Sequence, residues 1–133
     1  MSATCQVAVT TRLARALADH ASAPRAPLGS LEVVLVLDPP ALVVSRGCQP
    51  LLVIELLPNA AAWRELPART RAYAERGVQE LWIVPPGAEQ IEVRRRLRTG
   101  GFGPSVFYMA GERLSSPSLL HFELEVASLF TQA

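Results

Sequence analysis

The sequence contains no lysine, only two cysteines and no long uninterrupted run of hydrophobic residues. All 13 basic residues are therefore arginine, and the abundance of alanine, proline and arginine is typical of a GC-rich genome. No reaction of this protein can use a lysine ammonium, and arginine does not replace it as a proton donor of adjustable pKa. Cys5 and Cys48 lack the CxxC spacing of a zinc site, and they argue against a disulfide framework.

The absence of long hydrophobic runs also limits the expected location of the protein in the cell. No apolar segment approaches the ~20 residues that cross a bilayer, and the N-terminus lacks the basic start and apolar core of a signal peptide. We therefore expect a cytoplasmic protein without membrane contact. The net charge of +1 creates no overall field toward nucleic acid. With 133 residues, 50% of them hydrophobic, the chain is expected to form one domain over residues 1–133.

Hydrophobic periodicity predicts a mixture of helices and strands. Amphipathic spacing predicts an N-terminal helix over residues 7–20, and prolines and a glycine predict a loop over 21–29. A helix is expected over 67–76, since Pro67 suits a first helical position, where its missing N–H costs nothing. Residues 63–66 could begin this helix or form a turn before it. A last short helix is expected over 126–130. Strands are expected over 31–37, 41–45, 51–57, 79–84, 90–98, 106–109 and 112–114.

Two of these strands indicate the fold class. Residues 51–57 and 81–84 are almost continuously apolar, which is typical of strands covered on both faces. A helix expected between them would pack across the sheet. The pattern predicts an α/β or α+β domain with a mixed central sheet flanked by helices.

Glu55 interrupts the most hydrophobic of these strands. An isolated carboxylate in an apolar interior costs many kcal/mol unless it is paired, protonated or bound to metal. Two interpretations follow for this residue: a metal ligand, or a carboxylate paired with a nearby arginine such as Arg69 across the boundary between strand and helix.

Three blocks of sequence stand out together. The blocks are Pro40–Val44 with Leu52–Leu56, then Arg69–Tyr73 with Gly77–Val84, and finally Leu114–Pro117 with 124–130. They resemble a bacterial family of restriction-endonuclease-like proteins, expanded in cyanobacteria, within the PD-(D/E)XK nuclease superfamily, and the resemblance covers about residues 31–130. In the second block, the family has Lys, three residues, Tyr, and then Gly-Val-x-Glu-Tyr-Trp followed by an apolar residue and Val.

The resemblance implies a nuclease fold with a changed active site. Such nucleases hold Mg²⁺ with carboxylates from two neighbouring strands, and the metal activates water beside the scissile phosphate. Glu55 keeps the second carboxylate, whereas the first falls on Ala41 and the family's lysine falls on Arg69. Asp38 could replace the first carboxylate only through a bulge or bend, since an extended chain places it roughly 10 Å from residue 41.

The remaining polar candidates are arginines of the strand over 90–98. Arg94, Arg96 and Arg98 share one face with Glu92 and could contact phosphate, or they could form an ordinary solvated face. No aromatic residue alternates with them, as a platform for single-stranded nucleic acid requires. Tyr73 and Trp82 are expected in the core.

Three functions are compatible with this sequence. The first is a catalytically degraded nuclease relative that acts as a homodimeric interaction module. The second is an active Mg²⁺-dependent DNA endonuclease that uses Glu55, Asp38 and Arg69. The third is a nucleic-acid binder without catalysis, using Arg94, Arg96 and Arg98.

Overall fold

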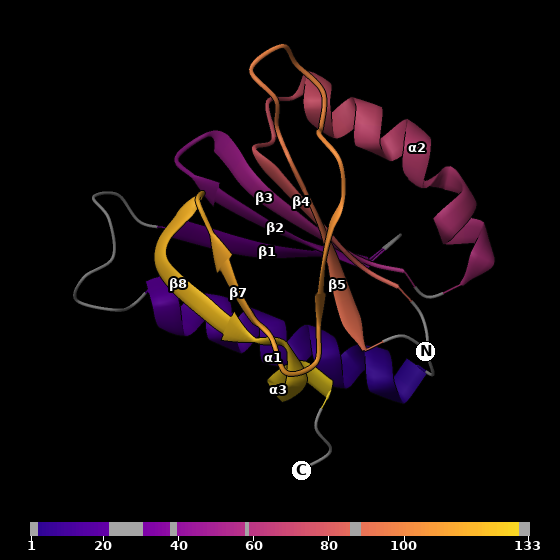
Figure 1. Ribbon diagram of the computed structural model, residues 1–133, viewed down its shortest axis with the longest axis vertical. Helices are drawn as coiled ribbons and strands as arrows, with labels where there is room; N and C mark the ends of the chain where they lie inside the picture. Colours follow the sequence, from indigo (N-terminus) through magenta and orange to yellow (C-terminus); the bar gives the residue numbers. More distant parts are fainter. Residues whose placement is uncertain (1–2, 22–30, 38–39, 58, 86–88, 131–133) are drawn as a thin grey trace.

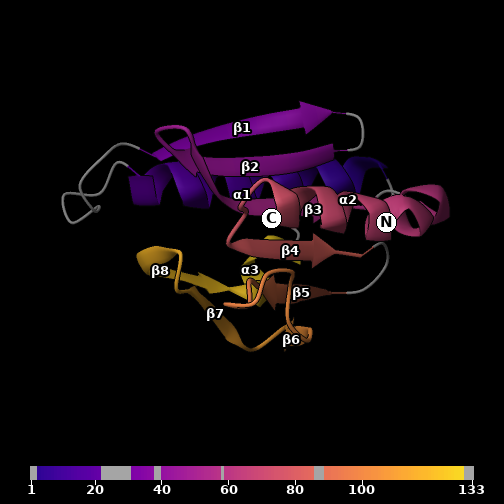
Figure 2. The same ribbon diagram turned by 90° about the horizontal axis from the view of Figure 1, so that it is seen from above.

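A six-stranded mixed sheet forms the centre of the molecule (Figures 1 and 2). The computed structural model describes residues 3–21, 31–37, 40–57, 59–85 and 89–130. The helices are α1 (Ala3–Ala21), α2 (Ala60–Glu75) and α3 (Val126–Phe130). The strands are β1 (Leu31–Leu37), β2 (Pro40–Arg46), β3 (Gln49–Leu56), β4 (Glu80–Val84), β5 (Gln90–Arg95), β6 (Val106–Met109), β7 (Arg113–Ser116) and β8 (Leu119–Glu125).

Strands β1 to β6 lie in the sheet in the same order as in the sequence. Neighbouring strands are antiparallel except β3 and β4, which are parallel. Parallel neighbours need a crossover connection, and α2 supplies it. Strands β7 and β8 form a separate antiparallel pair. The expected mixed sheet flanked by helices is therefore confirmed.

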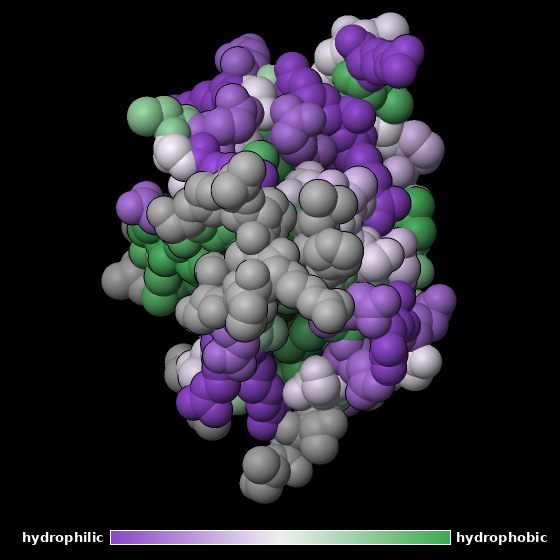
Figure 3. Space-filling view, turned by 90° about the vertical axis from the view of Figure 1, so that its left-hand side faces the viewer, coloured by the Kyte–Doolittle hydropathy of each residue, from purple (hydrophilic) through white to green (hydrophobic). Residues whose placement is uncertain are grey.

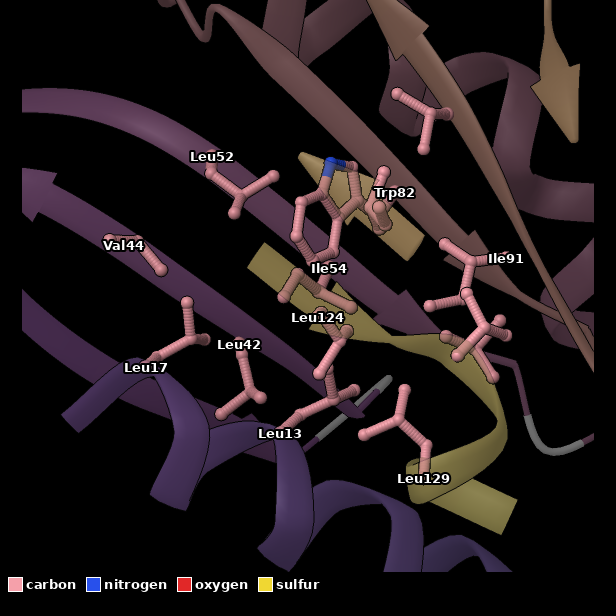
Figure 4. Close-up of a cluster of buried hydrophobic side chains, with 14 of the residues drawn as sticks. Leu13, Leu17, Leu42, Val44, Leu52, Ile54, Trp82, Ile91, Leu124 and Leu129 are labelled. Atoms are coloured by element: carbon pink, nitrogen blue, oxygen red, sulfur yellow. The ribbon is translucent and has the colours of Figure 1, made fainter. Parts of the chain in front are cut away.

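Two layers cover the two faces of the sheet. Helix α2 lies on one face, whereas α1 and α3 lie with the β7–β8 pair on the other (Figure 1). The larger hydrophobic core fills the second side, where leucines of α1 meet side chains of the sheet, β8 and α3 (Figure 4). No helix in the described ranges is both long and apolar enough to cross a membrane.

Strand β3 is buried on both faces, as its sequence predicts. Leu52, Ile54 and Leu56 belong to the core on the α1 side. Val53 and Leu57 belong to a smaller core beneath α2. Since successive strand residues point to opposite faces, Glu55 must point toward α2.

The expected helix over 67–76 begins too late. Helix α2 starts at Ala60, and the side chain of Asn59 caps it by accepting a 2.9 Å hydrogen bond from the amide of Ala62. Pro67 therefore lies inside the helix, where its ring removes one backbone hydrogen bond. The cap and the buried face of Ala62 and Leu66 outweigh this cost. The seven expected strands are present, although β8 was not predicted and the loop over 21–29 falls almost entirely outside the described residues.

A second buried carboxylate joins the sheet to the β7–β8 pair. Glu80 has no exposed surface and begins β4. It accepts hydrogen bonds from the indole N–H of Trp82 at 2.7 Å, the hydroxyl of Ser116 at 2.5 Å and the amide of Ser118 at 3.2 Å. These donors satisfy a group that would otherwise be costly to bury, and they fix the β7–β8 turn against β4.

Replacing Glu80 with leucine is expected to destabilise the protein by roughly 3 kcal/mol, because two buried donors lose their acceptor. Equilibrium unfolding in urea measures this change. Glu123→Leu is the matched control, because Glu123 is exposed on β8 and should change stability by about 0.5 kcal/mol or less. Equal losses in the two variants would contradict a special role for Glu80.

Candidate functional site

The side chain of Glu55 is fully buried between β3 and α2. The guanidinium of Arg69 lies against it in a bidentate arrangement. The Nε–H of Arg69 donates to Oε2 of Glu55 at 2.8 Å, and Nη2–H donates to Oε1 at 2.9 Å. This geometry is the strongest form of a carboxylate–arginine contact. The interpretation of Glu55 as a carboxylate paired with Arg69 therefore agrees with the structure.

Arg69 is itself held in place from several sides. Its Nη2 also donates to the backbone oxygen of Ala62, two turns earlier in α2, at 2.8 Å. The carboxylate of Glu65 lies 3.7 Å from Nη1. The hydrogen bond to Glu55 raises the pKa of Arg69 above its ordinary value, although partial burial opposes the shift. The guanidinium is therefore a permanent positive charge at this position.

Tyr73 completes the arrangement from the next turn of α2. Residues four apart share one face of a helix, so Tyr73 lies beside Arg69. Its hydroxyl donates to Oε2 of Glu55 at 2.5 Å. Burial, followed by the hydrogen bond to Glu55, raises the pKa of Tyr73 above its ordinary value of 10.0, which keeps the phenol protonated. The sequence predicted Tyr73 in the core but not this contact with Glu55.

Ala41 lies directly opposite Glu55 in the antiparallel pairing of β2 with β3. Side chains of such a pair share one face of the sheet, with Cβ atoms about 5 Å apart. Ala41 is buried in the same small core as Leu66 of α2. The structure thus brings together three of the sequence-based positions, Ala41, Glu55 and Arg69. Asp38 lies outside the described residues.

The match to the family model Uma2, described as putative restriction endonuclease, extends over residues 6–128. The chain belongs to this family. The Uma2 family lies within the PD-(D/E)XK superfamily, so the resemblance and the restriction-endonuclease-like fold are both confirmed. No curated protein matches the chain.

The described residues around Glu55 do not fit the Mg²⁺ ion on which restriction-endonuclease-like families typically depend. Magnesium needs several oxygen ligands around it. Both oxygens of Glu55 already accept hydrogen bonds from Arg69 or Tyr73, and Ala41 offers no ligand atom. Within the described ranges, no three His, Cys, Asp or Glu side chains are grouped as a metal site requires.

Two of the three arginines that the sequence singled out are tied to the protein. Arg94 forms a 2.6 Å ion pair with Glu92, whose carboxylate also accepts a hydrogen bond from Ser105. Arg96 donates to the backbone oxygen of Ala74 in α2 at 2.6 Å. Arg98 is exposed. The prediction that Arg94 and Arg96 share a face with Glu92 is consistent with these contacts, all of which lie on the α2 side.

Sequence reasoning missed an open pocket between α2 and β5. Its volume is about 380 Å³. We call it the α2–β5 pocket, and its lining consists of Trp63, Leu66, Pro67, Thr70, Arg71 and Arg94. Trp63 is 42% exposed, which is unusual for a tryptophan. The helical spacing of residues 63, 67 and 70 could have indicated that they share one face of a helix. No sequence pattern indicates that this face lies beside Arg94, which belongs to β5.

Replacing Arg69 with methionine is expected to reduce the free energy of unfolding by about 3–5 kcal/mol, because Glu55 loses its charge partner while remaining buried. Urea unfolding measures the loss. Arg71→Met is the control, since Arg71 is exposed on the same helix. The double variant Glu55→Leu/Arg69→Met should recover much of the stability. An Arg69→Met variant as stable as Arg71→Met would contradict this assignment.

Proposed function

We propose that this Uma2 protein keeps the nuclease fold, has lost phosphodiester hydrolysis, and acts as a homodimeric interaction module. The observation that carries the proposal is the closed contact among Glu55, Arg69 and Tyr73, with Ala41 at the opposing position. The carboxylate and the guanidinium neutralise each other, so little negative charge is left to attract a divalent cation.

The surface beside Glu55 supports the same proposal. Val36 of β1 pairs with Ala41, which pairs in turn with Glu55, so the three residues form one row across the sheet. Val36 is 43% exposed. The side chains of Val36 and Ala41 offer no hydrogen-bond donor to the phosphate that a nuclease must hold next to its metal ion.

The dimer is proposed at β1, an edge strand of the sheet (Figure 2). Among the described strands, β1 pairs only with β2. Hydrophobic side chains gather at one margin of the face in Figure 3, over this edge, where Val34, Leu35 and Val36 are 43–51% exposed. Natural edge strands are usually protected by charges or prolines, and β1 carries only Glu32.

Antiparallel pairing of β1 with β1 of a second copy fits this sequence. With Val34 opposite its own counterpart, Glu32 lies opposite Val36 of the second chain, so no like charges meet. The pairing would join two sheets into one continuous sheet and would bury the exposed valines.

The rival function is an active Mg²⁺-dependent endonuclease in which Asp38 joins Glu55 and Arg69. It requires the Arg69 contact with Glu55 to open, which the burial of Glu55 opposes. Nucleic-acid binding by Arg94, Arg96 and Arg98 is weakened as an alternative because Glu92 and the Ala74 carbonyl already engage two of these groups.

A plasmid-nicking assay with Mg²⁺ or Mn²⁺ tests the loss of hydrolysis. We expect the plasmid to stay intact with the wild-type protein, as with Glu55→Gln. Metal-dependent nicking that Glu55→Gln abolishes would overturn the proposal and establish the active alternative.

A second experiment tests whether the missing carboxylate at position 41 explains the loss of metal binding. The variant Ala41→Asp/Arg69→Lys places two carboxylates on one face and removes the bidentate fork. We expect Mn²⁺ binding by calorimetry in this variant and none in the wild type. Arg71→Lys with Ala41 retained serves as the control.

Multi-angle light scattering after gel filtration tests the dimer. The wild type should have twice the mass of one chain, and Val34→Lys should convert it to a monomer, because a charge at an edge strand opposes pairing. Val106→Lys, on the strand β6 at the other edge, should leave the dimer intact. A wild-type monomer at high concentration would refute the dimer.

A further inference from the structure

The α2–β5 pocket combines apolar and cationic groups in one lining. Trp63 and Pro67 supply flat apolar surfaces, whereas Arg71 and Arg94 supply positive charge. Among the described residues, no carboxylate belongs to this lining, although Glu92 lies directly beneath Arg94. A volume of about 380 Å³ falls in the range that holds a small organic ligand. The chemistry of the lining therefore fits a molecule with a flat ring and a negative charge.

Arg94 is held in place by the residues beneath it. Its Nε–H donates to Oε2 of Glu92 at 2.7 Å and to the hydroxyl of Ser105 at 3.2 Å, and its Nη2 forms a 2.6 Å ion pair with the same oxygen of Glu92. Glu92 therefore offsets much of the charge of Arg94, and the net positive charge of the pocket comes from Arg71. The side chain of Arg94 is only 26% exposed. These contacts fix the plane of the guanidinium, so little conformational entropy is lost when a ligand oxygen binds.

Arg71 and Trp63 are the groups still available to a ligand. Neither side chain has a hydrogen bond or ion pair to the described residues. Arg71 is exposed on α2, two turns after Arg64. An exposed indole offers a π-face on which any of the nucleobases can stack. The arginine fork suits bidentate contact with phosphate oxygens.

We propose that the α2–β5 pocket binds a nucleoside phosphate unit, with the base on Trp63 and the phosphate between Arg71 and Arg94. The unit can belong to a free nucleotide or to a single strand of nucleic acid. Phe107 extends the same face, because it pairs with Glu92 and is 49% exposed. The pocket lies on a different flank of α2 from Arg69 and Tyr73, so this site does not depend on whether Glu55 is catalytic.

The two tryptophans allow a direct test by nitrogen-15 NMR. The chain has one indole signal from Trp63 and one from Trp82, whose N–H is buried and bonded to Glu80. Titration with AMP should move the Trp63 signal and leave the Trp82 signal in place. Ribose 5-phosphate lacks the base and adenosine lacks the phosphate, so each should bind at least about tenfold more weakly than AMP.

Matched variants separate the site from general charge attraction. Arg71→Gln should weaken AMP binding about tenfold, the loss expected for one charge-assisted contact. Arg64→Gln removes the same charge from the same helix outside the pocket and should change affinity by about twofold or less. Trp63→Ala should make AMP and ribose 5-phosphate bind equally. Equal losses in the two arginine variants would overturn the proposal.

Further ligands decide the source of the nucleotide. An oligothymidylate that binds more tightly than its mononucleotide supports a single strand as ligand, and equal affinity supports a free nucleotide. Phenyl phosphate binding as tightly as AMP would overturn the nucleotide assignment in favour of a phosphorylated aromatic side chain. Absence of any Trp63 shift with AMP would overturn the site, whatever the nicking assay finds.

Discussion

The buried carboxylate of Glu55 is the constraint on which the central unit of this protein depends. It lies between the third strand and the crossover helix, out of contact with solvent, and it must be compensated there. Arg69 and Tyr73 compensate it from two successive turns of α2. The position and rotation of the helix on the sheet are thereby coupled to one charge. Through these contacts the carboxylate holds α2 against the sheet.

Much of the fold could be predicted because its signals are local. Residues 31–37 and 106–109 have the bounds that their hydrophobic pattern indicated, and the apolar runs of β3 and β4 correctly indicated burial on both faces. The start of α2 could not be inferred from Pro67, because the cap at Asn59 and the buried face around Leu66 outweigh the proline. Strand β8 was missed even though Phe122 and Leu124 alternate with acidic residues.

The candidate site was predictable only in part. The cost of burying Glu55 required a partner, and Arg69 was one of the residues considered. The hydroxyl of Tyr73 was not anticipated, because its side chain resembles an ordinary core residue in sequence. The proximity of Trp63 to Arg94 could not be inferred from the sequence, since the rest of α2 and strand β4 lie between them. The aromatic group absent near the arginines in sequence is supplied by another element in space.

The order of the strands has a consequence for how the chain folds. Each antiparallel pair of the main sheet joins strands that are neighbours in sequence, so these contacts can form early and with little loss of chain entropy. The parallel pairing of β3 with β4 is different, because it must wait for the whole crossover to close. That closure also brings Arg69 to Glu55. We therefore expect the contact between β3, β4 and α2 to form late in folding. Its strength should then set the unfolding rate of the sheet and have little effect on the rate at which the hairpins form.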